Sequence, residues 1–374
     1  MFINGPINVV RLEGSINNIN KIIYVFFDYH ATEKKQTECE TFDSINIIQY
    51  LYNIFKTSDK IIDFFMEIKN SNINKEYNTK RYIETVSDFY NRAQFKEDIK
   101  KNIKKNIRFH YLDIRNYLQK DIYSHIDQLN KSIYNIRVNK DILYSDYHNI
   151  INSCSKLIYE LEIYKNFFEN ESVVPDNIND NKQKIYYYLN KIMEKYNNPD
   201  IIKKTKTFYI DNVSKEIITV LEELKKLHKL ILEKEDYIYR QYETKKKNRN
   251  NVMTYYDFED FNDYSNNINK LNDSIQHKML IIFTKLTDLF FIRRFLDKDY
   301  INLAISYTGM AHSINYIYTL VSFFDFKITN YSFSEVDLDQ LNKIAKTNIE
   351  ELRDALYPKY LIQCSNLTDF PKDF

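Results

Sequence analysis

The stretch Tyr300-Ile-Asn-Leu-Ala-Ile-Ser-Tyr-Thr-Gly309-Met-Ala-His312-Ser-Ile-Asn-Tyr-Ile-Tyr-Thr-Leu-Val-Ser-Phe323 decides the fold. Its first part is a short apolar run with the length of a buried strand. After Gly309, apolar residues recur at helical spacing, so the sequence predicts a strand, a glycine turn and a helix. The chain has 3 glycines in all, and one kept at such a junction indicates a positive φ or a close backbone approach. Open α/β sheets bind ligands at these strand ends, so His312 is a candidate site residue.

Other apolar runs predict further strands. Residues 22–27 are continuously apolar, as in a strand that is covered on both faces. Residues 107–113 predict another strand, and residues 7–13 predict one that ends in a turn at Gly14. Residues 61–68 are predicted to extend the helix that precedes them. The fold class predicted is therefore α/β.

The direction of the strands follows from what lies between them. The strands predicted at 22–27, 107–113 and 301–307 are each followed by an amphipathic helix, and parallel neighbours need such crossovers. We therefore expect these three strands side by side and parallel. The predicted sheet is mostly parallel and is formed by the N- and C-terminal parts of the chain.

The middle of the chain has a different pattern. From 140 to 298, apolar residues recur at three- and four-residue spacing with almost no glycine or proline, which predicts a large all-helical insertion. The predicted domains are an α/β core of residues 1–139 and 299–374 and a helical insertion subdomain of residues 140–298.

Polar side chains follow the three predicted parallel strands, and these ends share one edge of the sheet. Asp28, His30, Asp113 and His312 form a plausible ligand set for a divalent metal of unknown identity, which would activate a bound water. Arg115 would anchor a carboxylate or phosphate. These five residues are the candidate catalytic group. The alternative is that they cap helices and make buried hydrogen bonds.

Charge and cysteine content narrow the choice of partners and compartment. Lys+Arg 53 against Asp+Glu 52 gives a formal net charge of +1, so overall charge gives no support for nucleic-acid binding. Three separated cysteines do not suggest a disulfide framework and favour a reducing compartment. The N-terminus predicts no signal peptide, and no run of roughly 18 charge-free apolar residues predicts a membrane span.

The late motif Gly309-Met-Ala-His312 resembles the Gly-x-x-His motif of the TraB/Tiki and erythromycin-esterase-like superfamily. That group carries two such motifs around a long helical middle, and several members are metal-dependent hydrolases. The early segment Phe27-Asp28-Tyr29-His30 keeps the histidine and lacks the glycine. The AT-rich-type composition and the motif layout also resemble uncharacterised proteins of large DNA viruses, which implies a cytoplasmic or virion location.

Two function classes follow from these observations. One is a metal-dependent, hydrolase-like viral enzyme of unknown substrate. The other is a non-catalytic virion or host-interaction protein that keeps an enzyme-like fold. Candidate partners are a second copy of the chain or virion proteins. The two classes differ in whether Asp28, His30, Asp113 and His312 converge in an open pocket.

Overall fold

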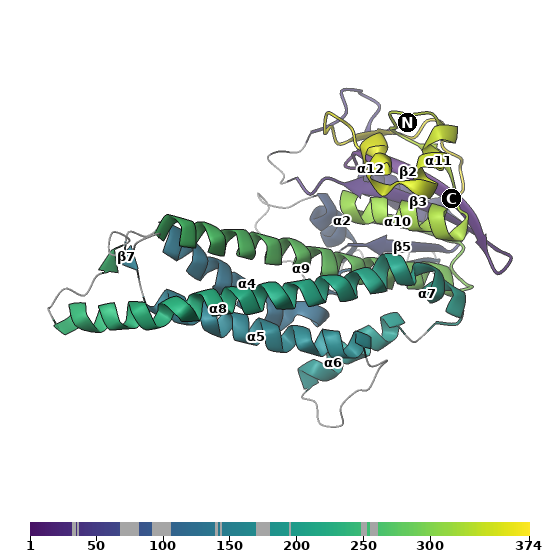
Figure 1. Cartoon of the computed structure of the whole chain (residues 1–374). Helices are drawn as coiled ribbons and strands as arrows, with labels where there is room; N and C mark the ends of the chain where they lie inside the picture. Colours follow the sequence, from purple (N-terminus) through teal and green to yellow (C-terminus); the bar gives the residue numbers. More distant parts are fainter. Residues whose placement is uncertain are drawn as a thin grey trace. The chain divides into compact units, whose positions relative to one another are not determined.

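The computed structural model divides the chain into two compact units, which are described separately (Figure 1). The sheet unit comprises residues 1–114, 192–205 and 287–374, and the helical unit comprises residues 115–191 and 206–286. The predicted boundaries, a core domain of residues 1–139 and 299–374 with a helical subdomain of residues 140–298, stay a prediction. The structure describes residues 1–374 except 32–34, 36, 68–81, 92–105, 139–140, 143, 170–179, 194–195, 248–252 and 255–260.

The elements follow one another in an order that mixes strands and helices at both ends of the chain. In the sheet unit they are β1 (Phe2–Asn4), β2 (Asn8–Ile16), β3 (Ile19–Asp28), β4 (Ile45–Asn46), α1 (Ile47–Thr57), β5 (Ile62–Met66), α2 (Tyr82–Asn91), β6 (Ile107–Tyr111), α7 (Pro199–Thr205), β9 (Leu303–Gly309), α10 (Met310–Phe324), β10 (Lys327–Tyr331), α11 (Leu338–Thr347), α12 (Ile349–Leu356) and β11 (Cys364–Asn366).

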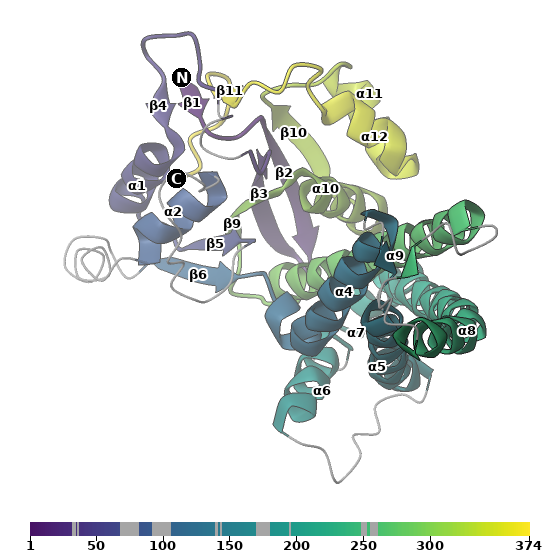
Figure 2. The ribbon, with the colours of Figure 1, turned by 90° about the vertical axis from the view of Figure 1, so that its left-hand side faces the viewer.

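The main sheet has the strand order β10-β2-β3-β9-β5-β6 (Figure 2). The pairs β3–β9, β9–β5 and β5–β6 are parallel, whereas β2 pairs antiparallel with β3 and with β10. The α/β class is confirmed, but the prediction of a mostly parallel sheet is wrong, because the sheet is mixed. The three strands predicted to be parallel do share this sheet, with β5 between β9 and β6.

A hairpin is the reason for the mixed directions. Asn17 and Asn18 have φ angles of 51° and 64°, as the type I′ turns that join two antiparallel strands require. The prediction of a turn at Gly14 is wrong, since Gly14 lies inside β2 opposite Lys21. A Cβ on Gly14 would lie 2.4 Å from the ring of Phe326. The absence of a side chain at Gly14 therefore lets the ring of Phe326 pack directly against the backbone of β2.

Strand β5 lies where the sequence predicted a continuing helix, so that prediction is wrong. Its five residues, Ile-Asp-Phe-Phe-Met, are all buried, and an apolar run this short fits a strand as well as a helix. One face of the sheet packs on α1 and α2 around residues such as Phe55, Phe64 and Tyr307, and α10 covers the other face (Figure 2).

The helical unit is built from long helices. Its elements are α4 (Arg115–Val138), β7 (Asp141–Ile142), α5 (Tyr144–Glu169), α6 (Asp180–Met193), the π-helix η3 (Lys206–Asp211), α8 (Asn212–Lys247), β8 (Met253–Thr254) and α9 (Phe261–Asp297). The ends of two of these helices, α6 from residue 192 and α9 from residue 287, belong to the sheet unit.

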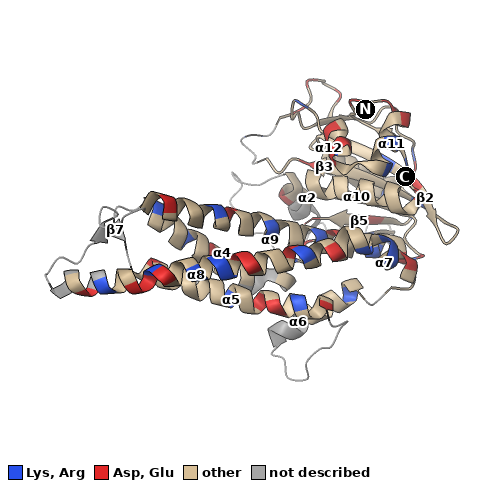
Figure 3. Ribbon diagram, in the orientation of Figure 1, with Lys and Arg blue, Asp and Glu red and all other residues tan. Residues whose placement is uncertain are grey.

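This middle region is largely helical, but the prediction of an all-helical insertion is wrong, because two strands pair within it. The two-residue strands β7 and β8 pair antiparallel and so satisfy backbone groups between the ends of the helices. Lys, Arg, Asp and Glu alternate along α8, whereas α10 carries none of them (Figure 3). This difference is typical of a solvated helix and of a core helix, respectively.

A small sheet of order β11-β1-β4 brings the two ends of the sheet unit together. Cys39 and Cys364 form a disulfide there across 325 residues of sequence, and Cys154 is buried and free. The sequence did not suggest a disulfide framework, so this bond was not expected. Sequence spacing did not indicate the bond, because it depends on the pairing of β11 with β1.

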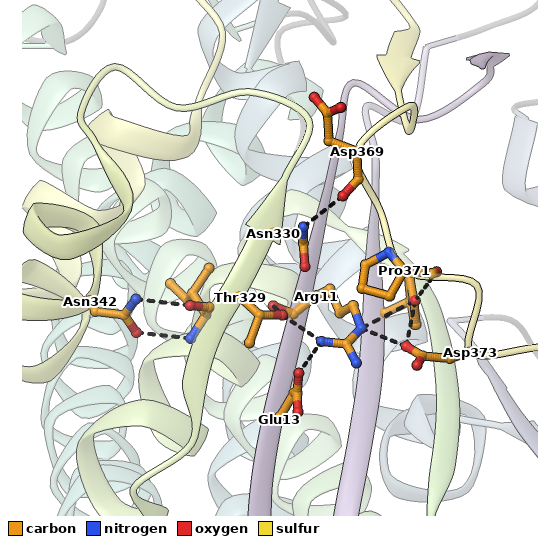
Figure 4. A network of polar contacts seen from close by, with 10 residues as sticks. Arg11, Glu13, Thr329, Asn330, Asn342, Asp369, Pro371 and Asp373 are labelled. Atoms are coloured by element: carbon orange, nitrogen blue, oxygen red, sulfur yellow. Dashed lines mark hydrogen bonds and ion pairs between the residues drawn. The ribbon is translucent and has the colours of Figure 1, made fainter.

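The last residues of the chain lie against strands β2 and β3 (Figure 4). The Arg11 guanidinium donates to Asp373 at 2.6 Å and to Thr329 Oγ1 at 2.6 Å. The Tyr24 hydroxyl donates to the same Asp373 carboxylate at 2.7 Å. The Arg11 side chain is only 3% exposed, so these contacts compensate a buried charge.

Candidate acid–base site

Strand β3 ends in a turn that fixes the position of His30. The Asp28 carboxylate accepts hydrogen bonds from the His30 backbone N–H at 2.8 Å and from its Nδ1. The second Asp28 oxygen accepts from the buried Tyr307 hydroxyl at 3.2 Å. His30 has a φ of 59°, which is uncommon for a residue with a side chain and tends to occur at functional sites.

Glu67 follows β5 directly and joins the ends of three strands. Its Oε2 accepts from the Gly309 backbone N–H at 2.7 Å and lies 3.6 Å from Nε2 of His30. Its Oε1 lies 3.2 Å from Nε2 of His312. Gly309 is the N-cap of α10, so the Glu67 carboxylate also interacts favourably with the positive end of that helix dipole.

Gly309 leaves the space in which His30 and Glu67 meet. A Cβ at this position would lie 2.6 Å from His30 Nε2 and 3.1 Å from Glu67 Oε2. The φ of Gly309 is −58°, which any residue can adopt. Of the two reasons that the sequence suggested for this glycine, close approach is therefore the one that applies.

His312 is held from its other side by a second carboxylate. Its Nδ1 contacts Asp288 on α9, and the other oxygen of Asp288 accepts from the Asn315 amide at 2.5 Å. The site is thus a row of contacts, Asp28–His30–Glu67–His312–Asp288. The His30 side chain is 32% exposed, whereas those of Glu67 and His312 are 5% and 7% exposed.

The contacts shift the pKa values of these groups in opposite directions. Burial alone would lower the pKa of His30, but hydrogen bonds to Asp28 and Glu67 raise it to about 9. Burial opposes ionisation of Glu67, but the two histidines hold the pKa of its carboxyl well below the usual range. Burial likewise disfavours charge on His312, and Glu67 and Asp288 raise its pKa well above the ordinary value.

Of the five residues predicted from the sequence, His30 and His312 both contact Glu67, and Asp28 joins the row through His30. Asp113 is buried and lies just after β6, next to Leu112, whose N–H binds the carbonyl oxygen of Met66 at 2.8 Å. Arg115 is the first residue of α4 and belongs to the helical unit.

Glu67, Asp288 and Asn315 were not among the residues predicted from the sequence. Glu67 was hidden because residues 61–68 were assigned to a helix, although an acidic residue after a short apolar run is the signal that marked Asp28. Asp288 is an acidic residue within the apolar stretch of α9, and such a residue is almost never fully buried without a partner.

The ligand types for a divalent metal are present, since two imidazoles and a carboxylate meet. Within the described ranges, however, no group of three or more His, Cys, Asp or Glu is arranged to hold a metal ion. The Nδ1 atoms face Asp28 and Asp288, and the Nε2 atoms face Glu67. The metal stays a prediction.

The fold and this row of contacts define an α/β protein with a histidine–glutamate centre at the carboxyl ends of parallel strands. The chain belongs to DUF5847, a family of unknown function, whose model matches residues 1–374. No solved structure matches the chain. In the part of the chain that the structure describes, no helix has the length and apolar character of a membrane span.

Relatives come from Acanthamoeba polyphaga mimivirus. Uncharacterized protein R706 is 32% identical over 411 residues, which cover 100% of this chain and 96% of the relative. Uncharacterized protein R160 is 31% identical over 444 residues, which cover 100% of this chain and 97% of the relative. The predicted likeness to proteins of large DNA viruses is confirmed, whereas the comparisons show no likeness to the TraB/Tiki group.

Proposed function

We propose that the protein is a hydrolase in which His30 and Glu67 are the acid and the base. One observation carries this proposal: His30 is the partly exposed end of an otherwise buried row of acidic and basic groups, held there by a left-handed backbone. Two neighbouring groups whose pKa values are pushed apart are typical of an acid–base pair. Such perturbed groups cluster at functional sites.

The contacts suggest how the pair would cleave an ester or amide. At neutral pH, His30 is protonated because its pKa is about 9, and Glu67 is ionised. As water adds to the carbonyl carbon, Glu67 takes its proton. His30 then protonates the leaving group as the bond from the carbonyl carbon to that group breaks. The proton on Glu67 Oε2 then passes to His30 Nε2 once the two atoms, 3.6 Å apart in the resting structure, approach to hydrogen-bond distance, and this restores both groups.

His312 and Asp288 would act as positioning residues in this scheme. His312 lies against the Glu67 oxygen that does not face His30, so it orients the carboxylate and disfavours its protonation in the resting state. When His30 gives up its proton, one of the two positive charges beside Glu67 is removed. The pKa of Glu67, which by then carries the proton from water, therefore rises, and Glu67 retains that proton until it passes to His30.

A divalent metal, which the sequence suggested, would need the Nε2 atoms of His30 and His312 and an oxygen of Glu67. It would replace the contacts between these groups and would supply a more acidic water. Metal analysis of the purified protein tests this part of the proposal. A bound metal in stoichiometric amount that the His30→Ala/His312→Ala double variant loses would support it.

The test of the proposed function compares His30→Gln with the wild type on ethyl acetate, whose alkoxide leaving group needs a proton from a general acid. His148→Gln is the matched control, since His148 also faces a carboxylate, at 3.7 Å from Glu235, but lies in the helical unit. We expect a loss of at least about 100-fold in kcat for His30→Gln and none for the control. Equal rates for all three proteins would refute the assignment.

The second candidate is a non-catalytic virion or host-interaction protein. One observation favours this candidate: the polar groups Asp28, Glu67, Asp288 and His312 are buried. Buried polar groups make hydrogen bonds in any folded protein, including proteins without catalytic activity. In that case the His30→Gln variant would lose stability without any change in a panel of ester and amide assays. Copurification of a second copy of the chain or of virion proteins would then define its partners.

A further inference from the structure

The sheet unit contains an apolar cavity of about 460 Å³ that the acid–base site does not include. Its volume falls in the range of small-molecule pockets, roughly 300–1,000 Å³. Most of the wall is apolar, and its apolar residues include Phe2, Ile7, Phe333, Pro358, Ile362 and Cys364. The exposed ion pair between Lys359 and Glu335, at 3.1 Å, also lines the cavity.

One hydrogen bond and one disulfide connect the cavity wall with the segments on either side of His30. Ile7 in the cavity wall donates its N–H to the carbonyl oxygen of Phe27 at 3.0 Å, one residue before Asp28. Cys364 in the wall is bonded to Cys39, which lies in the segment after His30. The cavity and the acid–base site therefore belong to the same edge of the sheet.

We infer that this cavity binds the apolar acyl group of the substrate, whose carbonyl then lies at His30. The inference rests on the proposed function and adds the substrate class: carboxylic esters or amides with an unbranched aliphatic acyl chain. The cavity is concave and of small-molecule size, and its aliphatic and aromatic walls offer no buried charge that a polar group would need. A short alkyl chain fits this description.

Acyl-chain length is the measurable consequence. Each methylene group that is removed from water raises kcat/KM about fourfold, until the cavity is full. We expect this rise from p-nitrophenyl acetate through the butyrate to the hexanoate. Ile362→Glu places a charge in the wall at a side chain that is already 45% exposed, so the fold tolerates it. It should remove the dependence of kcat/KM on chain length.

The matched control is Ile61→Glu, because Ile61 is 52% exposed and does not line the cavity. It should keep the chain-length dependence of the wild type. A wild-type rate that does not rise with chain length, or a rise that Ile362→Glu leaves unchanged, would overturn the inference. Thermal melting of both variants verifies that each is folded.

A binding measurement separates this inference from the proposed function. The ketone 2-octanone has an alkyl chain and a carbonyl but cannot be hydrolysed, and its binding is followed by saturation-transfer NMR. Binding that Ile362→Glu abolishes and Ile61→Glu retains supports the cavity, even if no ester is cleaved and the hydrolase proposal fails. Absence of binding, or binding that Ile362→Glu does not affect, overturns the cavity assignment whatever the activity.

Discussion

Replacing Glu67 by glutamine is expected to lower the free energy of unfolding by about 2 kcal/mol at pH 6 and by much less at pH 9.5. Glutamine keeps the shape and can still accept from the Gly309 N–H, but it removes the charge that two histidines share. Truncating one partner of a buried ion pair costs about 3–5 kcal/mol. The figure here is smaller because Asp28 and Asp288 still contact the histidines.

The pH dependence follows from His30, whose pKa is raised to about 9 in the folded protein. Its protonation stabilises the fold fully below the unfolded pKa of about 6.5, and this contribution is lost as the pH rises through about 9. Glutamine at position 67 lowers the pKa of His30 in the folded protein, so the free energies of unfolding of the two proteins differ most at pH 6. By pH 9.5 the wild type has also lost most of this contribution.

The measurement is urea denaturation of both proteins at the two pH values. Glu162→Gln is the control, because Glu162 pairs with Lys225 at 3.3 Å on the surface, and its loss should change stability by less than about 0.5 kcal/mol at either pH. A Glu67→Gln effect that is equal at both pH values, or below about 0.5 kcal/mol at pH 6, would show that Glu67 is not a shared counter-ion.

Three further changes test other parts of the structure. Gly309→Ala should push His30 aside and lower kcat about 100-fold with little loss of stability; a fully active variant would contradict the geometry at 2.6 Å. Cys39→Ser should lower the free energy of unfolding by about 2–5 kcal/mol in oxidising buffer and have no effect under reduction; equal effects would argue against the disulfide. Asp373→Ala should lower the free energy of unfolding by about 2 kcal/mol, because it leaves the buried Arg11 guanidinium without one of its carboxylate partners; an unchanged urea midpoint would contradict this.

The strand–glycine–helix segment was predictable because each of its signals is local. A buried strand, a scarce glycine and a helical apolar stripe all lie between residues 300 and 323, and His312 follows from them. The end of β3 was predictable for the same reason, since a run of buried apolar residues stops at Asp28. These local signals indicated Asp28, His30 and His312, the three predicted residues that lie in the row of contacts, without any knowledge of how the strands pair.

The rest depended on contacts between distant segments. The five residues of β5 fit either a helix or a strand, and only the pairing with β9 and β6 on either side decides for a strand. Glu67 was missed because it directly follows that strand. The antiparallel part of the sheet depends on the turn at Asn17 and Asn18, a pair that lacks the glycine common in such turns. The disulfide depends on β11 reaching β1, which no spacing of cysteines reveals.

The pairing of β3 with β9 has a consequence for synthesis of the chain. Residues 303–309 leave the ribosome long after residues 19–28, which pair with them. At about 5–20 residues per second, the β2–β3 hairpin waits on the order of tens of seconds with both edges unpaired, because β10, the partner of β2, is also made late. The helices of residues 115–286 form mostly from nearby contacts and can fold during that interval. The nascent chain therefore exposes a β-strand edge until its last quarter is made, and that interval is when it is most exposed to aggregation.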